Sequence, residues 1–427
     1  MQYSENIIYK RLKSHEASLA VIGLGYVGLP VSLAFAEHFN VIGYDIDLHR
    51  IEELQKTYGA DRKSITFTSS EKDLNKASFF IITIPTPIDS KKNPDLTLLF
   101  NATKTIAKYI KPGDYIVYES TVYPGCTENE CVPILEKYSN LKLGKDFNVG
   151  YSPERINPND SIHSFSNTTK IVAANNTIAQ KNISMVYASA INSNIYEVSS
   201  IKVAESSKML ENAQRNVNIA LMNEFSILFS HMKIDISEVI EAASTKWNFN
   251  QYRPGLVGGH CIPVDPYYML SQATTLGIDM PVLQSSCFIN DGMAEYIVQS
   301  LYNILSETDK KANNIRALLM GITYKENIDD IRNSMAVTIY ELLKNKSINV
   351  DVTDPYANPD KVFDMYGITL SEKPESLYNL IIVTTAHNTY TNLNENYFRS
   401  ISDDNAVLAD LRGLYKGKIT TMKYWSL

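Results

Sequence analysis

A glycine-rich turn between an apolar run and a helical pattern constrains this chain more than any other feature. Residues 19–24 are apolar, and the sequence GLGYVG occupies residues 23–28. A helical pattern follows over residues 31–39, and a second apolar run at residues 41–45 ends in Asp45. Strand, turn, helix and strand in this order predict a βαβ unit with two parallel strands.

The spacing of the three glycines is typical of turns that bind phosphates. The first glycine permits the tight turn, the second lets the backbone approach a pyrophosphate, and the third lets the helix pack closely on the strand. Asp45 lies where an acid binds the adenosine ribose hydroxyls and would repel a 2′-phosphate. We therefore predict an NAD site that contains Gly23, Gly25, Tyr26, Val27, Gly28 and Asp45. Arg50 either reaches back to the adenosine side or is a solvated helix arginine.

A long helical segment separates two α/β patterns. Apolar runs at residues 79–84 and 115–118 extend the first pattern to about residue 200. Residues 201–232 lack Pro and Gly, and their apolar side chains recur mostly three or four positions apart, which predicts one helix of roughly 45 Å. Further helical patterns cover residues 234–244 and 284–304.

The second α/β pattern begins near residue 313. Its strand-like runs cover residues 317–322, 348–353, 380–385 and 406–411, and one helix is expected at residues 333–344. It has no G-x-G-x-x-G, so we expect it to bind something other than a dinucleotide. The predicted fold class is α/β, with two Rossmann-like doubly wound domains joined by a central long-helix dimerisation domain. The predicted domains cover residues 1–200, 201–305 and 306–427.

Composition excludes several classes of protein. A net charge of -7 gives no support to nucleic-acid binding. The four cysteines, Cys126, Cys131, Cys261 and Cys287, lack the spacing of a disulfide framework or a zinc site, so we expect no metal. No apolar run reaches the roughly 18 residues of a membrane span, and residues 1–18 lack the apolar core of a signal peptide. We therefore expect a cytoplasmic protein with no membrane partner.

One cysteine lies in a loop that favours chemistry. Cys261 belongs to the run GGHCIPVDP at residues 258–266, four positions before Asp265. A lone cysteine is ordinarily a small buried hydrophobe, but the adjacent glycines and the aspartate favour a nucleophile here. His260 is the weaker candidate for its base, because adjacent side chains tend to point apart. A dinucleotide site and such a thiol together indicate oxidation through a covalent intermediate.

The long helix supplies a second group of polar candidates. Lys208 and Asn212 lie one helical turn apart, and Arg215 lies close to the same face. A lysine, an amide and an arginine in this arrangement could hold an oxyanion and a sugar hydroxyl. The alternative is an ordinary solvated face.

Five motifs occur in order along the chain. They are the glycine turn, Ser152-Pro153-Glu154-Arg155, Lys208-x-x-x-Asn212, Gly258-Gly259-His260-Cys261, and Tyr324-Lys325 through Asp330-x-Arg332. Together they resemble the nucleotide-sugar 6-dehydrogenases of the UDP-glucose/GDP-mannose dehydrogenase family, over nearly the whole chain. Residues 245–249 and 253–261 look like those of bacterial enzymes acting on UDP-N-acetylglucosamine or UDP-N-acetylgalactosamine in surface-polysaccharide pathways. UDP-glucose enzymes tend to have a second glutamate where this chain has Asn157-Pro158.

The resemblance implies a four-electron oxidation and a homodimer or higher homo-oligomer. A primary alcohol at C6 becomes an aldehyde, Cys261 captures it as a thiohemiacetal, a second NAD oxidises this to a thioester, and water releases the carboxylate. It also implies that Lys208 and Asn212 steady the oxyanion, that Asp265 assists proton transfer, and that Thr121 and Glu154 position or activate the water. Thr86 and Thr121 would border the nicotinamide. The implied residues of the UDP-sugar site are Arg155, Ile156, Lys208, Asn212, Arg215, Arg253, Gly258, Tyr324, Lys325 and Arg332.

Other functions fit parts of the sequence. A UDP-N-acetylmannosamine dehydrogenase would share the Gly-Gly-His-Cys loop, and a UDP-glucose 6-dehydrogenase would share the chemistry. A non-catalytic nucleotide-sugar sensor would require a lost nucleophile or a broken glycine turn, and both are intact. A two-electron dehydrogenase would leave Cys261 idle.

Overall fold

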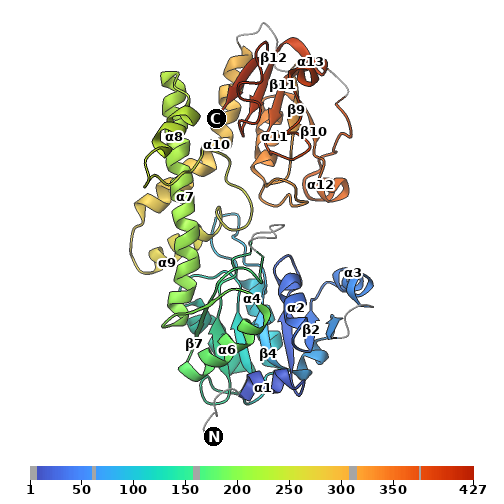
Figure 1. Ribbon diagram of the computed structural model, residues 1–427, viewed down its shortest axis with the longest axis vertical. Helices are drawn as coiled ribbons and strands as arrows, with labels where there is room; N and C mark the ends of the chain where they lie inside the picture. Colours follow the sequence, from blue (N-terminus) through green and yellow to red (C-terminus); the bar gives the residue numbers. More distant parts are fainter. Residues whose placement is uncertain (1–6, 60–63, 157–163, 307–314, 375–376) are drawn as a thin grey trace. The chain divides into compact units, whose positions relative to one another are not determined.

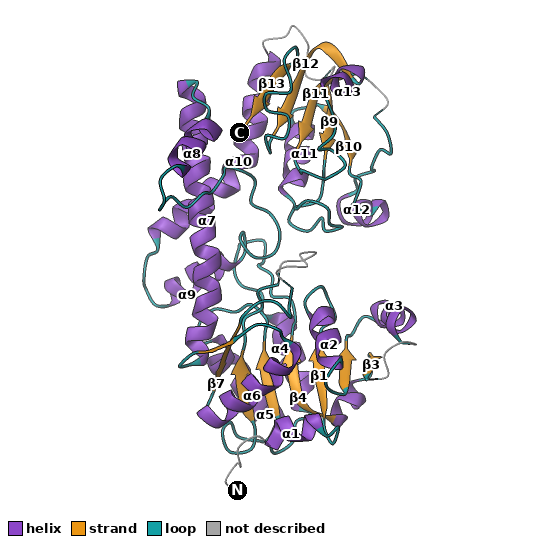
Figure 2. Ribbon diagram, in the orientation of Figure 1, coloured by secondary structure: helices purple, strands orange, loops and turns teal. Residues whose placement is uncertain are grey.

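The computed structural model describes residues 7–59, 64–156, 164–306, 315–374 and 377–427. The chain divides into two compact units, which we call the N-terminal unit (Met1–Glu211 with Tyr267–Ile278) and the C-terminal unit (Asn212–Pro266 with Asp279–Leu427). The predicted α/β class with two Rossmann-like sheets and a long central helix is confirmed (Figures 1 and 2). The three-domain division stays a prediction, and its boundary at residues 305 and 306 adjoins residues 307–314, which lie outside the described part.

The N-terminal unit is built on a sheet with the strand order β3-β2-β1-β4-β5-β6-β7-β8. Its strands are β1 (Ser18–Ile22), β2 (Val41–Tyr44), β3 (Ile65–Thr68), β4 (Ala77–Ile82), β5 (Tyr115–Tyr118), β6 (Asn148–Tyr151), β7 (Lys170–Ala174) and β8 (Ile195–Glu197). All six residues of β4 are buried, as expected for a parallel strand covered on both faces.

One strand departs from the predicted parallel arrangement. The pairs Gly150–Ala174 and Tyr151–Ala173 make β7 antiparallel to β6. Parallel neighbours need a long crossover, usually a helix, and the described residues between these two strands form none. The chain therefore returns beside β6 in the opposite direction.

The helices of this unit fall into two groups. One apolar core joins the sheet to α1 (Ile7–Lys13), α2 (Gly28–Ala36), α3 (Leu48–Tyr58) and α6 (Thr177–Ala190), and its largest side chains include Phe35, Phe39 and Tyr187. A second group consists of α4 (Thr97–Ala107) and α5 (Val132–Ser139), which pack against each other. A short π-helical segment, η2 (Thr127–Cys131), precedes α5.

The C-terminal unit contains the second sheet, in the order β10-β9-β11-β12-β13 with all pairs parallel. Its strands are β9 (Arg316–Met320), β10 (Asn349–Thr353), β11 (Tyr378–Val383), β12 (Ser402–Asp410) and β13 (Lys423–Ser426), and its helices are α11 (Met335–Asn345), α12 (Pro359–Tyr366) and α13 (Glu395–Ser400). Helix α10 (Pro281–Ser306) contributes Ile297, Val298 and Leu301 to the core of this sheet.

The long helix α7 (Ile201–Met232) has the predicted bounds, and α8 (Ile236–Ser244) and α9 (Asp265–Thr275) follow it. Within the C-terminal unit, buried asparagines join α7 to α10. Asn290 donates to Asn216 Oδ1 at 2.8 Å, and Asn223 donates to Asn290 Oδ1 at 2.9 Å. Among the described helices, none is long and apolar enough to cross a membrane.

Candidate active site

The glycine turn has the geometry that its sequence predicts. Gly23 has φ +90°, a conformation that favours glycine. A Cβ on Gly28 would lie 1.8 Å from the Gly23 carbonyl oxygen, so only glycine lets α2 approach β1 this closely. A Cβ on Gly25 would meet nothing within 4 Å. The turn is thus packed tightly at its first and third glycines and open at the second, where the backbone can approach a pyrophosphate.

The carboxylate of Asp45 is held beside this turn. Its Oδ2 accepts a hydrogen bond from Leu24 N at 2.7 Å, and its Oδ1 accepts one from Asp47 N at 3.0 Å. Arg50 donates from Nε to the Leu24 carbonyl at 3.1 Å and pairs with Glu53, so it contacts the turn. The exposed side chain of Ile46 stands next to Asp45 with 78% of its surface accessible. Sequence reasoning did not identify Ile46 as a candidate site residue. The signal that could have identified it is an apolar residue directly after the acid.

The loops after β4 and β5 are joined to each other. Thr86 donates from Oγ1 to the Thr121 carbonyl at 2.7 Å. The Tyr268 hydroxyl, on the part of α9 that belongs to the N-terminal unit, donates to the Thr86 carbonyl at 3.0 Å. Thr83 binds the Gly23 carbonyl at 2.8 Å, so the β4 end also contacts the glycine turn. The two threonines predicted to border the nicotinamide therefore belong to one hydrogen-bonded group.

A buried ion pair connects the Ser-Pro-Glu-Arg motif to α7. Lys208 Nζ lies 3.7 Å from Glu154 Oε2, and both side chains are less than a tenth exposed. Glu154 also accepts a hydrogen bond from Ile156 N. Arg155 pairs with Glu211 on α7. The structure thus brings Glu154 and Lys208 together, whereas Arg155, predicted to contact the sugar, is engaged by a carboxylate.

The thiol loop leads directly into α9. The Cys261 carbonyl accepts hydrogen bonds from Val264 N at 3.0 Å and Asp265 N at 2.8 Å, which close a turn behind the half-buried thiol. The buried Asp265 carboxylate accepts a hydrogen bond from Asn212 Nδ2 at 2.6 Å. Two of the predicted catalytic residues, Asn212 and Asp265, are therefore in contact in the C-terminal unit.

His260 is oriented by a different partner. Its Nε2 lies 3.3 Å from Asp330 Oδ2, and Asp330 in turn accepts hydrogen bonds from Arg332 at 2.9 and 2.7 Å. Burial opposes the charge on Asp330, but the hydrogen bonds from Arg332 and His260 lower the pKa of this carboxyl well below its ordinary value. Arg332, an implied residue of the UDP-sugar site, is thus held by a carboxylate.

The two glycines before Cys261 leave no room for a side chain, Gly259 because of the Tyr324 ring and Gly258 because of the Asn333 backbone. A Cβ on Gly259, which has φ +88°, would lie 2.6 Å from Tyr324 Cε2, and one on Gly258 would lie 2.9 Å from the Asn333 carbonyl. Burial, followed by the charges of Asp330 and Cys261, raises the pKa of Tyr324 to about 12. A small cavity of about 30 Å³ lies at this point, lined by Gly258, Tyr324, the N-terminus of α11 and Arg412, among others.

The second sheet repeats part of the first site. Gly321 directly follows β9 and has φ +99°. Asp354 follows β10 and accepts hydrogen bonds from Ile322 N at 2.6 Å and Thr323 N at 3.1 Å. Thr384 after β11 donates to the Met320 carbonyl at 3.1 Å, as Thr83 does to Ile22 in the first sheet. Sequence reasoning predicted a second Rossmann-like sheet but missed the matching contacts of Asp354 and Thr384, although an aspartate after the second strand indicates them.

The remaining predicted residues have varied surroundings. Arg215 and Arg253 are exposed, and Lys325 and Ile156 are half-buried. The loop that leads from Arg253 to the thiol is held at Gly255, whose N–H donates to Asn223 Oδ1 at 2.8 Å. Asn223 was missed, because its amide stands among apolar helix positions with no motif around it. The described residues contain no cluster of three or more His, Cys, Asp or Glu side chains that could hold a metal ion.

A glycine turn with its acid and a thiol loop beside a second nucleotide-type sheet define an oxidoreductase of nucleotide-linked substrates. Three family models match the chain: the NAD binding domain of the UDP-glucose/GDP-mannose dehydrogenase family over residues 17–191, its central domain over 202–292, and its UDP binding domain over 318–417. The chain belongs to the UDP-glucose/GDP-mannose dehydrogenase family and is an NAD-dependent dehydrogenase.

Individual relatives are similar over almost their whole length. Protein CapL of Staphylococcus aureus is 43% identical over 407 residues, which are 93% of this chain and 96% of that protein. A UDP-N-acetyl-D-glucosamine 6-dehydrogenase of Pseudomonas aeruginosa is 42% identical over 410 residues, 93% of this chain and 97% of that protein. Among solved structures, a UDP-D-ManNAc dehydrogenase of Pyrococcus horikoshii has a TM-score of 0.87 and 28% identity, covering 96% of this chain and 98% of that chain.

Proposed function

We propose that the protein oxidises C6 of a UDP-N-acetylhexosamine, UDP-N-acetylglucosamine or UDP-N-acetylgalactosamine, to the uronate for surface polysaccharide biosynthesis. The Asn212–Asp265 contact is the observation that carries the chemistry, because Asp265, whose N–H closes the turn at the half-buried Cys261, has its carboxylate held by an amide of α7. The greater identity to a UDP-N-acetylglucosamine enzyme than to a mannosamine enzyme supports the substrate. The consumption of NAD and a UDP-sugar favours the cytoplasm.

The glycine turn and Asp45 would hold NAD. The open side of Gly25 and the N-terminus of α2 suit a pyrophosphate, and Asp45 suits the adenosine ribose. The exposed face of Ile46 would cover the adenine, and Thr86 and Thr121 would border the nicotinamide. When bound, NAD accepts a hydride from carbon 6 in each of two oxidations.

The chain's own groups would perform the remaining steps. The Cys261 sulfur adds to the aldehyde carbon and retains it, so the aldehyde does not leak between the two oxidations. Lys208 and Asn212, one turn apart on α7, would stabilise the oxyanion of each tetrahedral adduct. Asp265 would relay the alcohol proton, and Glu154 with Thr121 would orient the water that releases the carboxylate. One sugar thus consumes two NAD and one water.

The UDP moiety would bind in the C-terminal unit. The small cavity at Tyr324 is lined both by Gly258 of the thiol loop and by the N-terminus of α11. Backbone N–H groups at the start of a helix favour phosphate. Lys325, Arg253 and Arg332 would supply cations to the pyrophosphate, with Arg332 exchanging Asp330 for phosphate oxygens. Arg155, Ile156 and Arg215 would complete the sugar side.

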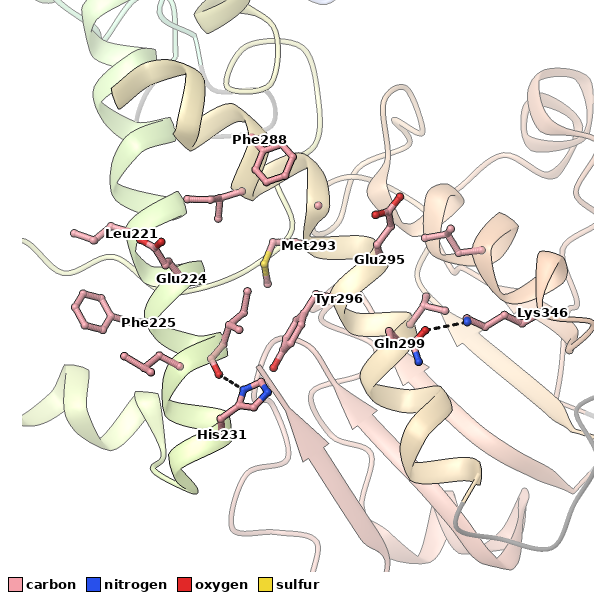
Figure 3. A pocket seen from close by; sticks show the side chains of 16 residues that line it. Leu221, Glu224, Phe225, His231, Phe288, Met293, Glu295, Tyr296, Gln299 and Lys346 are labelled. Atoms are coloured by element: carbon pink, nitrogen blue, oxygen red, sulfur yellow. Dashed lines mark hydrogen bonds between the residues drawn. The ribbon is translucent and has the colours of Figure 1, made fainter. Parts of the chain in front are cut away.

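We also propose that two copies pair through α7 and α10. A groove of about 1280 Å³ runs along these helices in the C-terminal unit, and Figure 3 shows Leu221 and Phe225 on α7 opposite Phe288 and Met293 on α10. Leu221, Phe225 and Phe288 are 44%, 39% and 81% exposed. Apolar area of this extent is costly to leave in water, and a second copy of the same helices would cover it.

A panel of UDP-sugars tests the substrate. We expect kcat/KM with NAD to be greatest for UDP-N-acetylglucosamine or UDP-N-acetylgalactosamine. UDP-N-acetylmannosamine and UDP-glucose are the two alternatives, and a clear preference for either would overturn the substrate while leaving the reaction class intact. Absence of NADH with every sugar, although NAD binds, would favour a nucleotide-sugar sensor.

A further inference from the structure

A charged pair lies completely inside the N-terminal unit, outside the groups that the proposed reaction uses. Lys170, the first residue of β7, is 3% exposed, and Glu119, which directly follows β5, has no exposed side-chain surface. Lys170 Nζ donates to Glu119 Oε2 at 2.9 Å, and the Tyr187 hydroxyl of α6 donates to Glu119 Oε1 at 2.5 Å. The rings of Phe165 and Tyr187 lie 5.2 and 5.3 Å from Nζ.

Stability alone is a weak reason for such a pair. The free-energy cost of removing two charges from water is about as large as the stabilisation from their attraction. Well-packed apolar residues in the same place often give a protein of equal stability. The position of the pair is therefore more informative than its strength. An aromatic cage and two hydrogen bonds to Glu119 fix both charged ends in place.

The pair joins two loops that carry proposed catalytic groups. Besides Glu119, Lys170 Nζ binds the Pro153 carbonyl at 3.3 Å, and the next residue is Glu154. Glu119 lies two positions before Thr121. One ammonium group thus connects the segment of Glu154 to the segment of Thr121. It adds to two hydrogen bonds between these segments, from Ser152 N to the Tyr118 carbonyl at 3.0 Å and from the Tyr151 hydroxyl to the Ser120 carbonyl at 3.1 Å.

We propose that Lys170 and Glu119 are positioning residues that align Glu154 with Thr121 for hydrolysis of the thioester. The proposal rests on the proposed function. In this step a water oxygen bonds to the thioester carbon, the C–S bond breaks, Cys261 leaves as the thiolate, and two protons pass to the sulfur and to solvent. No electrons are transferred, because both oxidations are complete. Asp45 and the first glycine of the turn hydrogen-bond to Leu24, Asp47 and Thr83, so we expect NAD binding to depend on the pair less than hydrolysis does.

The test uses the double variant Lys170→Met/Glu119→Gln, which leaves no unpaired buried charge. We expect kcat to fall about tenfold or more while kcat/KM for the UDP-sugar stays within about threefold, because kcat/KM reports the steps before deacylation. Rapid mixing should show a burst of two NADH for each active site, and intact mass should reveal an acyl group on the protein. Lys170→Arg, which keeps a cation and donors, should restore most of the rate.

Phe79→Leu serves as a matched control. Phe79 is buried in β4 and stacks on Tyr115, away from both loops, so the substitution should reduce stability without disturbing the pair.

If the double variant lowers kcat and kcat/KM together without acyl-enzyme, or leaves kcat unchanged, the proposal is wrong. If the double variant does not fold, Tyr187→Phe tests the proposal instead. This variant removes one hydrogen bond to Glu119 and should slow only deacylation. A parent protein that never yields two NADH would instead refute the proposed function.

Discussion

The carboxylate of Asp45 is expected to make the protein prefer NAD over NADP. Its oxygens are held by Leu24 N and Asp47 N, so it would present a fixed negative charge at the proposed site of the ribose. Asp45→Ala should lower the ratio of kcat/KM for NAD to that for NADP by about tenfold or more, because both the ribose contact and the repulsion of a 2′-phosphate disappear. Steady-state rates with both cofactors measure this ratio.

The neighbouring Asp47 provides the control for this experiment. It caps α3 by accepting hydrogen bonds from His49 N and Arg50 N, and its loss should cost about 1 kcal/mol of stability without changing the cofactor ratio. An Asp45→Ala variant that kept the parent preference for NAD would show that the carboxylate does not select the cofactor.

Some residues of the site could not be predicted because no local pattern marks them. Lys170 and Glu119 are 51 positions apart and meet only because the sheet places their strand ends together. The pairing of Asp330 with His260, which is 70 positions away, likewise depends on tertiary structure. Residues such as Gly28 were predictable, since a glycine at fixed spacing has one physical reason wherever that turn occurs.

Substitution of two glycines in the βαβ turn should have different effects, one on stability and the other on NAD affinity. Gly28→Ala places a Cβ against the Gly23 carbonyl, so α2 must move away from β1, and we expect a loss of about 3 kcal/mol or more in unfolding free energy. Gly25→Ala meets open space, so we expect a stability change under about 1 kcal/mol but NAD affinity reduced about tenfold or more. Urea unfolding and NAD titration separate the two. Equal stability losses would contradict the packing described for this turn.

Helix α7 is attached to the turn before η2 by Glu205. This fully buried carboxylate accepts hydrogen bonds from Gly125 N at 2.5 Å and Thr127 N at 3.0 Å, and burial raises its pKa from 4.5 to about 7. Between these values the folded protein binds more protons than the unfolded chain, so this group lowers stability as pH rises through that window. Compared with Glu205→Gln, the parent should therefore lose stability from about pH 4.5 to 7 and no further above it.

Urea unfolding of both proteins across this range measures the difference. Burial raises the pKa of Asp114 to about 6. Its effect on the pH dependence of stability is the same in both proteins, so it cancels in their difference. Parallel stability curves would mean that folding does not raise the pKa of Glu205.

Elements with strong local patterns were predicted well, and weak ones were missed. The runs at residues 115–118 and 201–232 form β5 and α7 with the predicted bounds, because apolar periodicity there is uninterrupted. The three-residue β8 and the antiparallel β7 were not predicted, since their place depends on sheet edges rather than on their own residues. Helix α10 extends two or three residues beyond the prediction at each end, and at its C-terminal end Leu305 is part of the second core.

The molecule as a whole is expected to act as a homodimer. Phe288→Glu would place a charge in the groove of Figure 3, so the dimer should dissociate to monomers in light scattering at assay concentration. Phe363→Glu, which changes an exposed apolar residue of α12 outside the groove, should leave the dimer intact. A parent protein that is monomeric and fully active would contradict this interface.

The number of NADH molecules formed for each sugar consumed tests the central claim most directly. Pure protein is incubated with excess NAD and a limiting amount of the preferred UDP-sugar, and NADH absorbance is compared with sugar lost and uronate formed. The proposed chemistry predicts two NADH and one uronate per sugar, and no uronate from Cys261→Ala, because the aldehyde must be captured before the second oxidation. One NADH per sugar, with an aldehyde or ketone as the product, would contradict it.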